Sequence, residues 1–249
     1  MERDRENYVV VKLSGRCGNQ FYQIATGLAY SYQYNSHFFV TSDAQNCDND
    51  AYYFTNFPKK DKSERIYSED TNKDNAIYNP LPYTPNVMLI GYWQTFEYFN
   101  NYREKILKEF NLPYKKMNGH VSLHVRRGDY LHLQEKLSIL TTDYYTKAIK
   151  YFLNIGYSKF LVFSDDIDWC KNIFDERFLE NACFDFSENR TELEDLSLMA
   201  SCEHNIVANS TFSYAASWLN QNTDKIVITP ANMFGGCNNK MIPKTYIII

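Results

Sequence analysis

A short segment ending in two arginines carries the clearest chemistry in this sequence. Residues 120–127 alternate apolar and polar side chains, the period of a β-strand with two different faces. His124 and Arg126 then project to the same face, and Arg127 follows directly. Because guanidinium groups match the geometry of phosphate oxygens, Arg126 and Arg127 can receive a diphosphate at the strand's carboxyl end. The alternative is a strand end with solvated arginines and a histidine whose hydrogen bonds are satisfied within the fold.

Polar residues also follow two other predicted strands, 159–164 and 204–208. Residues 164–166, Ser-Asp-Asp, end the first strand, and residues 209–211, Asn-Ser-Thr, end the second. The carboxyl ends of parallel strands share one edge of a sheet, where ligands of open α/β folds bind. We therefore expect these residues to meet Arg126.

Each of these polar groups has a second, purely structural interpretation. Residues 209–211 precede a predicted helix, so they form either a phosphate seat or an ordinary N-cap made by Asn209 or Ser210. Asp165 and Asp166 form either a metal-binding pair or the N-cap of the next helix, and capping is the favoured interpretation. Asp195, on a predicted helix, is either solvated or a partner for the paired donors of a base such as guanine.

The N-terminal part opens with a strand, a glycine loop and a helix. Residues 8–13 form the predicted strand, 14–20 the loop and 21–32 an amphipathic helix. Gly15 and Gly18 allow the backbone to approach a ligand closely at the helix N-terminus. A strand-to-helix turn that requires glycine geometry explains the same residues.

Composition narrows the class of protein. The chain has 249 residues with 44% hydrophobic content, enough for a well-buried core, and its formal net charge is −4. That charge argues against nucleic acid or an anionic membrane as the main partner. The six cysteines include no Cys-x-x-Cys pair, and the polar start of the chain resembles no signal peptide. No stretch is apolar enough to predict a membrane span. These features predict a soluble, cytoplasmic protein with reduced thiols.

Alternating strands and helices predict an α/β fold with parallel sheets. Residues 42–85 are polar and rich in proline, which predicts irregular structure and a loop region on the acceptor side. A strand at 87–92 and a helix at 95–110 follow, and residues 111–119 read as a linker. The chain is therefore predicted to divide into domains 1–112 and 113–249. In the second domain the expected strands are 120–127, 159–164, 204–208 and 225–229, and the expected helices are 142–153, 168–174, 192–202 and 211–219.

Four motifs, in family order, resemble the α-1,2-fucosyltransferases of glycosyltransferase family 11. They are Gly15-Arg-Cys-Gly-Asn-Gln-Phe-Tyr-Gln23, Gly91-Tyr-Trp-Gln94, His124-Val-Arg-Arg-Gly-Asp-Tyr130 and residues 195–213. The resemblance implies a GT-B-like enzyme with two Rossmann-like parallel-sheet domains facing a cleft. It also implies GDP-β-L-fucose as donor, O2 of a terminal β-galactoside as acceptor, inversion at the anomeric carbon, and no required metal or other cofactor. Residues 1–112 would then be the acceptor-side domain and residues 113–249 the GDP-fucose-binding domain.

The same resemblance suggests roles for individual residues. Arg126 resembles the arginine that holds the donor diphosphate, His124 the histidine near the nucleotide, and Asp195 the carboxylate that reads guanine. The chemistry of transfer adds one more role: the acceptor hydroxyl must lose a proton, and Asp129 is a candidate for the base that takes it, unless the departing phosphate does. The complete predicted donor site is Gly18, Asn19, His124, Arg126, Arg127, Ser164, Asp165, Asp195, Asn209, Ser210, Thr211 and Phe212.

The sequence departs from the family pattern in three ways. Cys17 stands where an apolar residue is usual, the chain is short for this architecture, and the signal anchor and stem of the Golgi members are missing. The last point predicts a soluble enzyme of the bacterial or viral type. Two rival functions remain open: a fucosyltransferase of α-1,6 or protein-O type, and a catalytically silent protein that binds a GDP-sugar or glycan.

Overall fold

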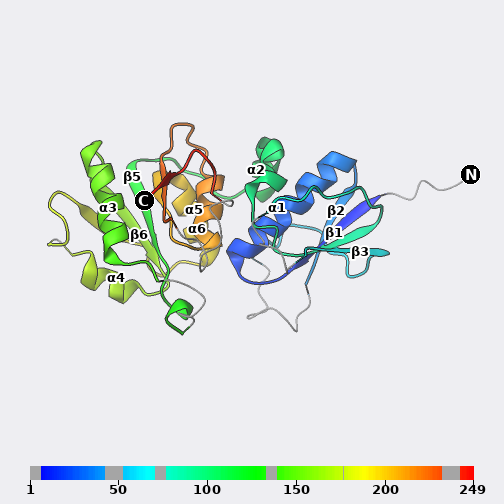
Figure 1. Ribbon diagram of the computed structural model, residues 1–249, viewed down its shortest axis with the longest axis horizontal. Coiled ribbons are helices and arrows are strands. Elements are labelled where there is room, and N and C mark those ends of the chain that lie inside the picture. The colour runs from blue at the N-terminus through cyan, green and yellow to red at the C-terminus, as the bar shows by residue number, and fades with distance from the viewer. Residues whose placement is uncertain (1–6, 43–52, 71–76, 133–138, 176, 232–241) are drawn as a thin grey trace, which may run out of the picture. The chain divides into compact units, whose positions relative to one another are not determined.

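The chain folds into two compact units, Met1–Leu112 and Pro113–Ile249 (Figure 1). The computed structural model describes residues 7–42, 53–70, 77–132, 139–175, 177–231 and 242–249. The boundary between the units falls in the segment predicted as the linker. Each unit has its own parallel sheet, so the predicted α/β fold with two parallel-sheet units is confirmed.

The first unit is built on a four-stranded parallel sheet in the order β2-β1-β4-β3. Its strands are β1 (Tyr8–Leu13), β2 (His37–Ser42), β3 (Arg65–Ser68) and β4 (Val87–Ile90). Val9, Val10 and Val11 of β1 are fully buried, as expected of a parallel strand covered on both faces.

The helix that follows β1, α1 (Cys17–Tyr34), is longer and more buried than predicted. Nearly all of residues 17–31 are buried, so α1 is a core helix and the predicted amphipathic character is wrong. Gly27 allows the close contact with the sheet, because a Cβ there would overlap the side chains of Val11 and Phe38. The unit is completed by two 3₁₀ turns, Phe96–Tyr98 and Asn100–Tyr102, and by α2 (Arg103–Phe110).

The second unit is built on a six-stranded parallel sheet in the order β10-β9-β8-β5-β6-β7. Its strands are β5 (Met117–Val125), β6 (Lys159–Ser164), β7 (Cys183–Phe186), β8 (Cys202–Ile206), β9 (Val227–Thr229) and β10 (Ile247–Ile248). Its helices are α3 (Thr142–Asn154), α4 (Ile167–Ile173), α5 (Glu192–Ser201) and α6 (Thr211–Leu219). The motif with two arginines thus follows a central strand, β5.

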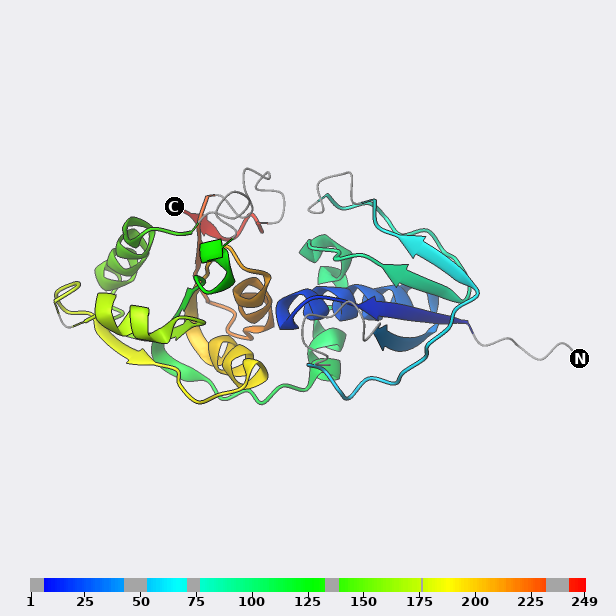
Figure 2. The ribbon, with the colours of Figure 1, turned by 90° about the horizontal axis from the view of Figure 1, so that it is seen from below.

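Helices cover both faces of this sheet (Figure 2), with α3 and α4 on one side and α5 and α6 on the other. Val121, Leu123 and Val125 pack in the core formed with α3 and α4. Ser122 and His124 point to the other face and are also buried. The polar face of β5 is therefore an interior face, which explains why its polar residues need partners within the fold.

Several predicted elements differ from those observed. The segment 42–85, predicted as irregular, contains the strand β3, and the predicted helix 95–110 begins as two 3₁₀ turns. The strands β7 and β10 were not predicted. These three missed strands, β3, β7 and β10, are short and lie at sheet edges. An edge strand buries little surface, so β3, which is mostly exposed, lacks the apolar pattern that reveals a strand.

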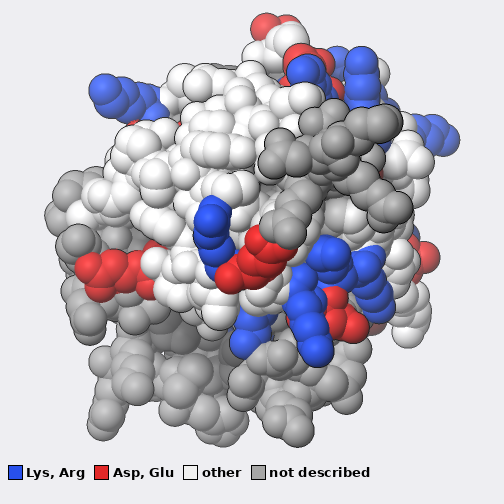
Figure 3. Space-filling model, turned by 90° about the vertical axis from the view of Figure 1, so that its right-hand side faces the viewer, with Lys and Arg blue, Asp and Glu red and all other residues white. Residues whose placement is uncertain are grey.

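The described surface shows mixed charge in the view from the right-hand side of Figure 1. There, Lys and Arg side chains lie beside Asp and Glu side chains and no field of a single sign covers the described atoms (Figure 3). In the part of the chain that the structure describes, no helix combines the length and apolar character needed to cross a membrane.

Candidate functional site

The carboxyl ends of β5 and β6 bring the two arginines and two aspartates together. Val125 at the end of β5 is in register with Ser164 at the end of β6, so the residues that follow are neighbours. Arg126 Nη1 lies 3.0 Å from Asp165 Oδ2, and Arg127 Nε lies 3.2 Å from Asp166 Oδ2. The meeting of these residues, predicted from the parallel sheet, is confirmed.

Both guanidinium groups are held on more than one side. The Arg126 and Arg127 side chains are only 14% and 18% exposed. The guanidinium carbon of Arg127 lies 3.9 Å from the ring centre of Trp169, and that of Arg126 lies 5.4 Å from the ring centre of Tyr130. Such cation–π contacts fix an arginine in addition to its ion pair. The alternative of solvated arginines is therefore wrong.

Gly128 allows one of these pairs to form. A Cβ at this position would lie 2.6 Å from Asp165 Oδ2, the oxygen that binds Arg126. The close carboxylate explains why this position is a glycine, since any side chain would displace it. Asp129 begins the next 3₁₀ turn, Asp129–His132, and its side chain lies outside the described atoms, so its role as base stays a prediction.

Asp166 is the N-cap of α4, which confirms the favoured interpretation. Its Oδ1 accepts a hydrogen bond from the N–H of Trp169 at 3.3 Å. Its own N–H donates to Ser164 Oγ at 2.9 Å, which ties Ser164 to the same turn. Within the described ranges, no three His, Cys, Asp or Glu side chains gather in a way that could hold a metal ion.

His124 is a neutral histidine inside the fold. It is 5% exposed, and burial together with the nearby Arg126 charge lowers its pKa to about 3. Its Nδ1 is buried and makes no hydrogen bond to any described residue. The His124 and Phe212 rings lie 5.7 Å apart, so two predicted site residues from distant motifs meet here. A neutral imidazole beside Arg126 can accept or donate a hydrogen bond without adding charge.

The N-terminus of α6 lies at the same edge of the sheet. Ser210 is the N-cap residue, yet its side chain makes no capping hydrogen bond. Tyr130 Oη donates to the Asn209 carbonyl at 3.0 Å, which connects this loop to the turn after Arg127. An N-cap without a side-chain bond leaves the dipole of the helix available to an anion. This favours the phosphate-seat interpretation of residues 209–211 over simple capping by Ser210.

Asp195 lies near the carboxyl end of β7, two strands from β5. Its Oδ1 accepts a hydrogen bond from Ser187 Oγ at 2.5 Å, and Ser187 directly follows β7. Arg190 Nη1 donates to the same Ser187 hydroxyl at 3.0 Å. Asp195 is half-buried and bound to Ser187, and burial raises its pKa, so it is not a fully solvated helix residue. Its role toward guanine stays a prediction.

The glycine loop of the first unit is shorter than predicted. Gly15 has a positive φ of 70°, whereas Gly18 and Asn19 lie in the first turn of α1. Gln94 Nε2 donates to Asn19 Oδ1 at 3.0 Å, and Gln23 Nε2 donates to the Gly91 carbonyl at 3.0 Å. Two motifs of the resemblance, 15–23 and 91–94, are thus joined by side-chain amides. Their predicted contact with the donor stays a prediction.

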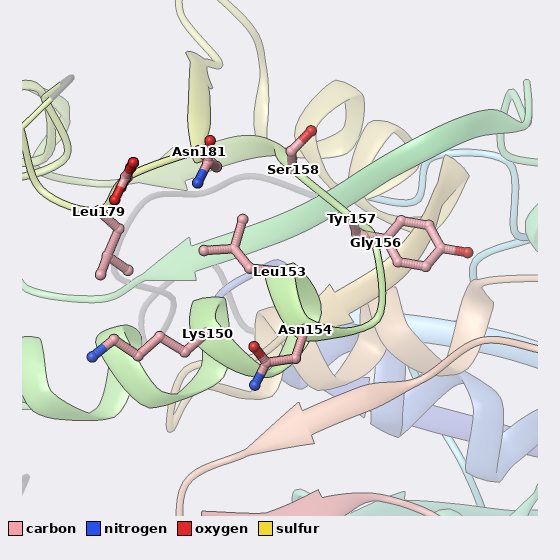
Figure 4. A pocket seen from close by; sticks show the side chains of 9 residues that line it. Lys150, Leu153, Asn154, Gly156, Tyr157, Ser158, Leu179 and Asn181 are labelled. Atoms are coloured by element: carbon pink, nitrogen blue, oxygen red, sulfur yellow. The ribbon is translucent and has the colours of Figure 1, made fainter.

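Some residues of the site carried no separate signal in the sequence. Trp169, Ser187 and Arg190 support predicted site residues, but each belongs to a segment without a motif. A pocket of about 570 Å3 beside Lys150 and Tyr157 lies near the start of β6, whereas the arginine site lies at the strand's carboxyl end (Figure 4). That pocket shares no residue with the arginine site.

Comparison with known proteins agrees with this arrangement. Residues 49–238 match the family model "Glycosyl transferase family 11". The chain is 33% identical to an α-1,2-colitosyltransferase of Escherichia coli over 91% of its own length and 92% of that protein. It is 24% identical to the galactoside 2-α-L-fucosyltransferase Sec1 of Mus musculus, over 86% of this chain and 65% of that one.

A solved structure supports the fold. Fucosyltransferase NodZ from Bradyrhizobium superposes with a TM-score of 0.50 at 13% identity, over 86% of this chain and 93% of that one. With one parallel sheet in each of its two units, the chain has a GT-B-like α/β fold. The chain belongs to glycosyltransferase family 11, the family that its motifs resemble.

Proposed function

We propose that this protein transfers L-fucose from GDP-β-L-fucose to O2 of a terminal β-galactoside, with inversion and without a metal ion. The observation that carries the proposal is the placement of Arg126 and Arg127 at the end of β5. The relatives named for α-1,2-fucosyl and α-1,2-colitosyl transfer support the reaction type.

The mechanism follows from where charge develops. The bond between the anomeric carbon and the β-phosphate oxygen breaks through an oxocarbenium-like state, and both electrons of that bond leave with GDP. Negative charge therefore increases on the β-phosphate. Arg126, Arg127 and the N-terminus of α6 at Ser210 would stabilise it, because donors fixed in advance need no reorganisation during the reaction.

The acceptor forms the new bond from the opposite face. Its O2 oxygen attacks the anomeric carbon, which inverts the configuration from β to α. The proton of that hydroxyl passes to a base, for which Asp129 is the candidate, or to the departing phosphate. His124, with its pKa lowered to about 3, is neutral and is not a reservoir for this proton near neutral pH.

The arginines can take the place that a divalent cation has in other transferases. Two guanidinium groups carry two positive charges and orient phosphate oxygens through directed hydrogen bonds. Asp165 and Asp166 each bind one of these arginines, and Asp166 also caps α4, so both carboxylates have structural roles. These roles support metal-independent transfer.

A transfer assay with defined donors and acceptors tests the proposal. We expect GDP-fucose and lactose to give an α-1,2-linked product, identified by NMR of the new linkage. GDP-colitose is the second donor to compare, because one relative is named for colitosyl transfer. Transfer to a chitooligosaccharide in preference to lactose would indicate the α-1,6 alternative. Tight GDP binding with neither transfer nor donor hydrolysis would indicate a silent binding protein.

A further inference from the structure

Glu69, directly after β3 in the first unit, is a carboxylate held by backbone N–H groups. Its Oε2 accepts hydrogen bonds from the N–H of Tyr92 at 2.6 Å and the N–H of Trp93 at 3.2 Å, and the Trp93 N–H also reaches Oε1 at 3.3 Å. Burial raises the pKa of Glu69, although these two donors act in the opposite direction. A carboxylate can accept about four hydrogen bonds. Glu69 therefore has acceptor capacity beyond the two backbone donors.

Trp93, whose N–H binds this carboxylate, belongs to a chain of four aromatic rings in contact, which we call the aromatic cluster: Tyr67, Tyr78, Trp93 and Tyr98. Tyr67 stacks on Trp93 with 6.2 Å between ring centres, and Trp93 meets Tyr98 edge-on at 5.6 Å. Tyr78 packs on Tyr98 at 5.0 Å and is 41% exposed. Burial raises the pKa of Tyr98 to about 12, and the charge of Glu69 acts in the same direction. Tyr78 therefore gives the cluster an exposed ring, and Glu69 itself is half-buried.

The backbone around Glu69 is constrained. Trp93 has a φ of 54°, a left-handed conformation that is rare for a bulky residue. A Cβ on Gly91 would lie 2.7 Å from Glu69 Oε2 and 2.9 Å from the Trp93 ring. The indole N–H of Trp93 is buried and has no acceptor among the described residues. Strained backbone and unsatisfied polar groups concentrate at functional sites.

We propose that Glu69 and the aromatic cluster form a subsite for a pyranose ring of the acceptor saccharide. A pyranose has an apolar C–H face, which packs on an aromatic ring, and hydroxyl groups, which donate to a carboxylate. Tyr78 supplies the exposed ring and Glu69 the acceptor. The inference rests on the proposed function and adds the residues that would recognise the acceptor.

Two matched pairs of variants test this subsite. Tyr78→Ala removes the exposed ring, and Tyr83→Ala is its control, because Tyr83 is 51% exposed but packs on Tyr34 outside the cluster. Glu69→Gln removes the carboxylate charge, and Glu97→Gln is its control at an exposed site nearby. For each variant, KM for lactose and KM for GDP-fucose are measured, together with the rate of GDP-fucose hydrolysis without acceptor.

The subsite predicts a selective effect on the acceptor. Tyr78→Ala and Glu69→Gln should each raise KM for lactose about tenfold, with KM for GDP-fucose and donor hydrolysis unchanged. The controls should leave all three values unchanged. An unchanged lactose KM in Tyr78→Ala, or equal changes for donor and acceptor, overturns the subsite. Saturation-transfer NMR with lactose alone gives a second measurement, in which Tyr78→Ala should lose the signal. Absence of any transfer by the wild type would instead contradict the proposed function.

A competing occupant can be distinguished in the same experiments. Aromatic rings beside a carboxylate also suit an organic cation. If the subsite takes a saccharide instead, tetramethylammonium should fail to compete with lactose for the wild-type protein. If it competes and lactose does not bind, the site takes a cation and the saccharide proposal is wrong.

Discussion

Asp165 binds Arg126 with one carboxylate oxygen and the backbone of Arg127 with the other. Its Oδ2 lies 3.0 Å from Arg126 Nη1, and its Oδ1 accepts the Arg127 N–H at 2.9 Å. A single aspartate directly after β6 therefore holds the Arg126 side chain and the Arg127 backbone at the end of β5. Since the pair is mostly buried, a donor diphosphate meets guanidinium groups whose positions are already set.

Replacing Arg126 should abolish most of the transfer activity. We expect Arg126→Ala to lower kcat at least about 100-fold, because one preorganised donor to the leaving phosphate is lost. Arg126→Lys should recover only part of the rate, since an ammonium group lacks the paired donors of a guanidinium. The control is Arg177→Ala, because the Arg177 side chain is 90% exposed and bound to Asp175. Near-normal turnover by a folded Arg126→Ala protein would rule out its assigned role.

Gly128 and Asp165 should be energetically coupled. Gly128→Ala places a Cβ 2.6 Å from Asp165 Oδ2, so the carboxylate must move away from Arg126. We expect about a tenfold loss of kcat/KM from Gly128→Ala in the wild type, and little further loss when it is added to Asp165→Ala. The double-mutant cycle measures this difference. Fully additive losses would mean that Gly128 acts through the turn alone.

His124 should make the protein less stable in mild acid. Burial lowers its pKa to about 3, so the folded state keeps it neutral while the unfolded state gains a proton below the ordinary value of 6.5. Between pH 3 and pH 6.5 the unfolded state binds more protons than the folded state. The free energy of unfolding therefore decreases as the pH falls through 6.5. The loss is about 1.4 kcal/mol per pH unit well below 6.5.

Denaturant unfolding at pH 7.5 and pH 5.5 measures this contribution. His124→Gln should lose less stability between the two pH values than the wild type, by about 1 kcal/mol. His120→Gln is the control, because His120 lies on the same strand but is only half-buried. Equal pH dependence in the His124 variant and the wild type would show that this histidine is not kept neutral by the fold.

Asp195 should determine the preference for guanine. Ser187 Oγ occupies one of its carboxylate oxygens at 2.5 Å, and the other can accept from the guanine edge. We expect Asp195→Asn to weaken GDP binding about tenfold or more and to reduce discrimination between GDP and IDP, which lacks the exocyclic amine. Calorimetric titration of both nucleotides checks this, with Glu188→Gln as a surface control. An unchanged ratio of the two affinities would remove Asp195 from the base-binding role.

The sequence predicts the interior of the second unit better than its edges. The strand 159–164 and the helix 211–219 have the observed bounds, because buried strands and helices impose apolar periods on the sequence. The polar residues that follow β5 and β6 could be placed together because parallel strands end at one edge. The ion pairs themselves could not be predicted, since nothing in the sequence shows that Asp165 would bind Arg126.

Other features depend on contacts between distant segments. Glu69 lies in a polar region without periodicity, and only the pairing of β3 with β4 brings it to Tyr92 and Trp93. Likewise, the burial of α1 comes from packing on all sides, which a single helix sequence with scattered tyrosines does not reveal. Tertiary contacts of this kind override local patterns.

Transfer should continue in excess chelator. Asp165 and Asp166 are the carboxylates beside the proposed phosphate site, and each already binds an arginine. We expect the rate in excess EDTA to stay within about twofold of the untreated rate, because guanidinium groups supply the charge stabilisation that a metal supplies elsewhere. The assay compares untreated protein, EDTA-treated protein, and treated protein with Mn²⁺ in excess over the chelator. Loss of activity in EDTA with recovery in Mn²⁺ would assign a metal to these aspartates, and Asp166→Asn should then abolish the recovery.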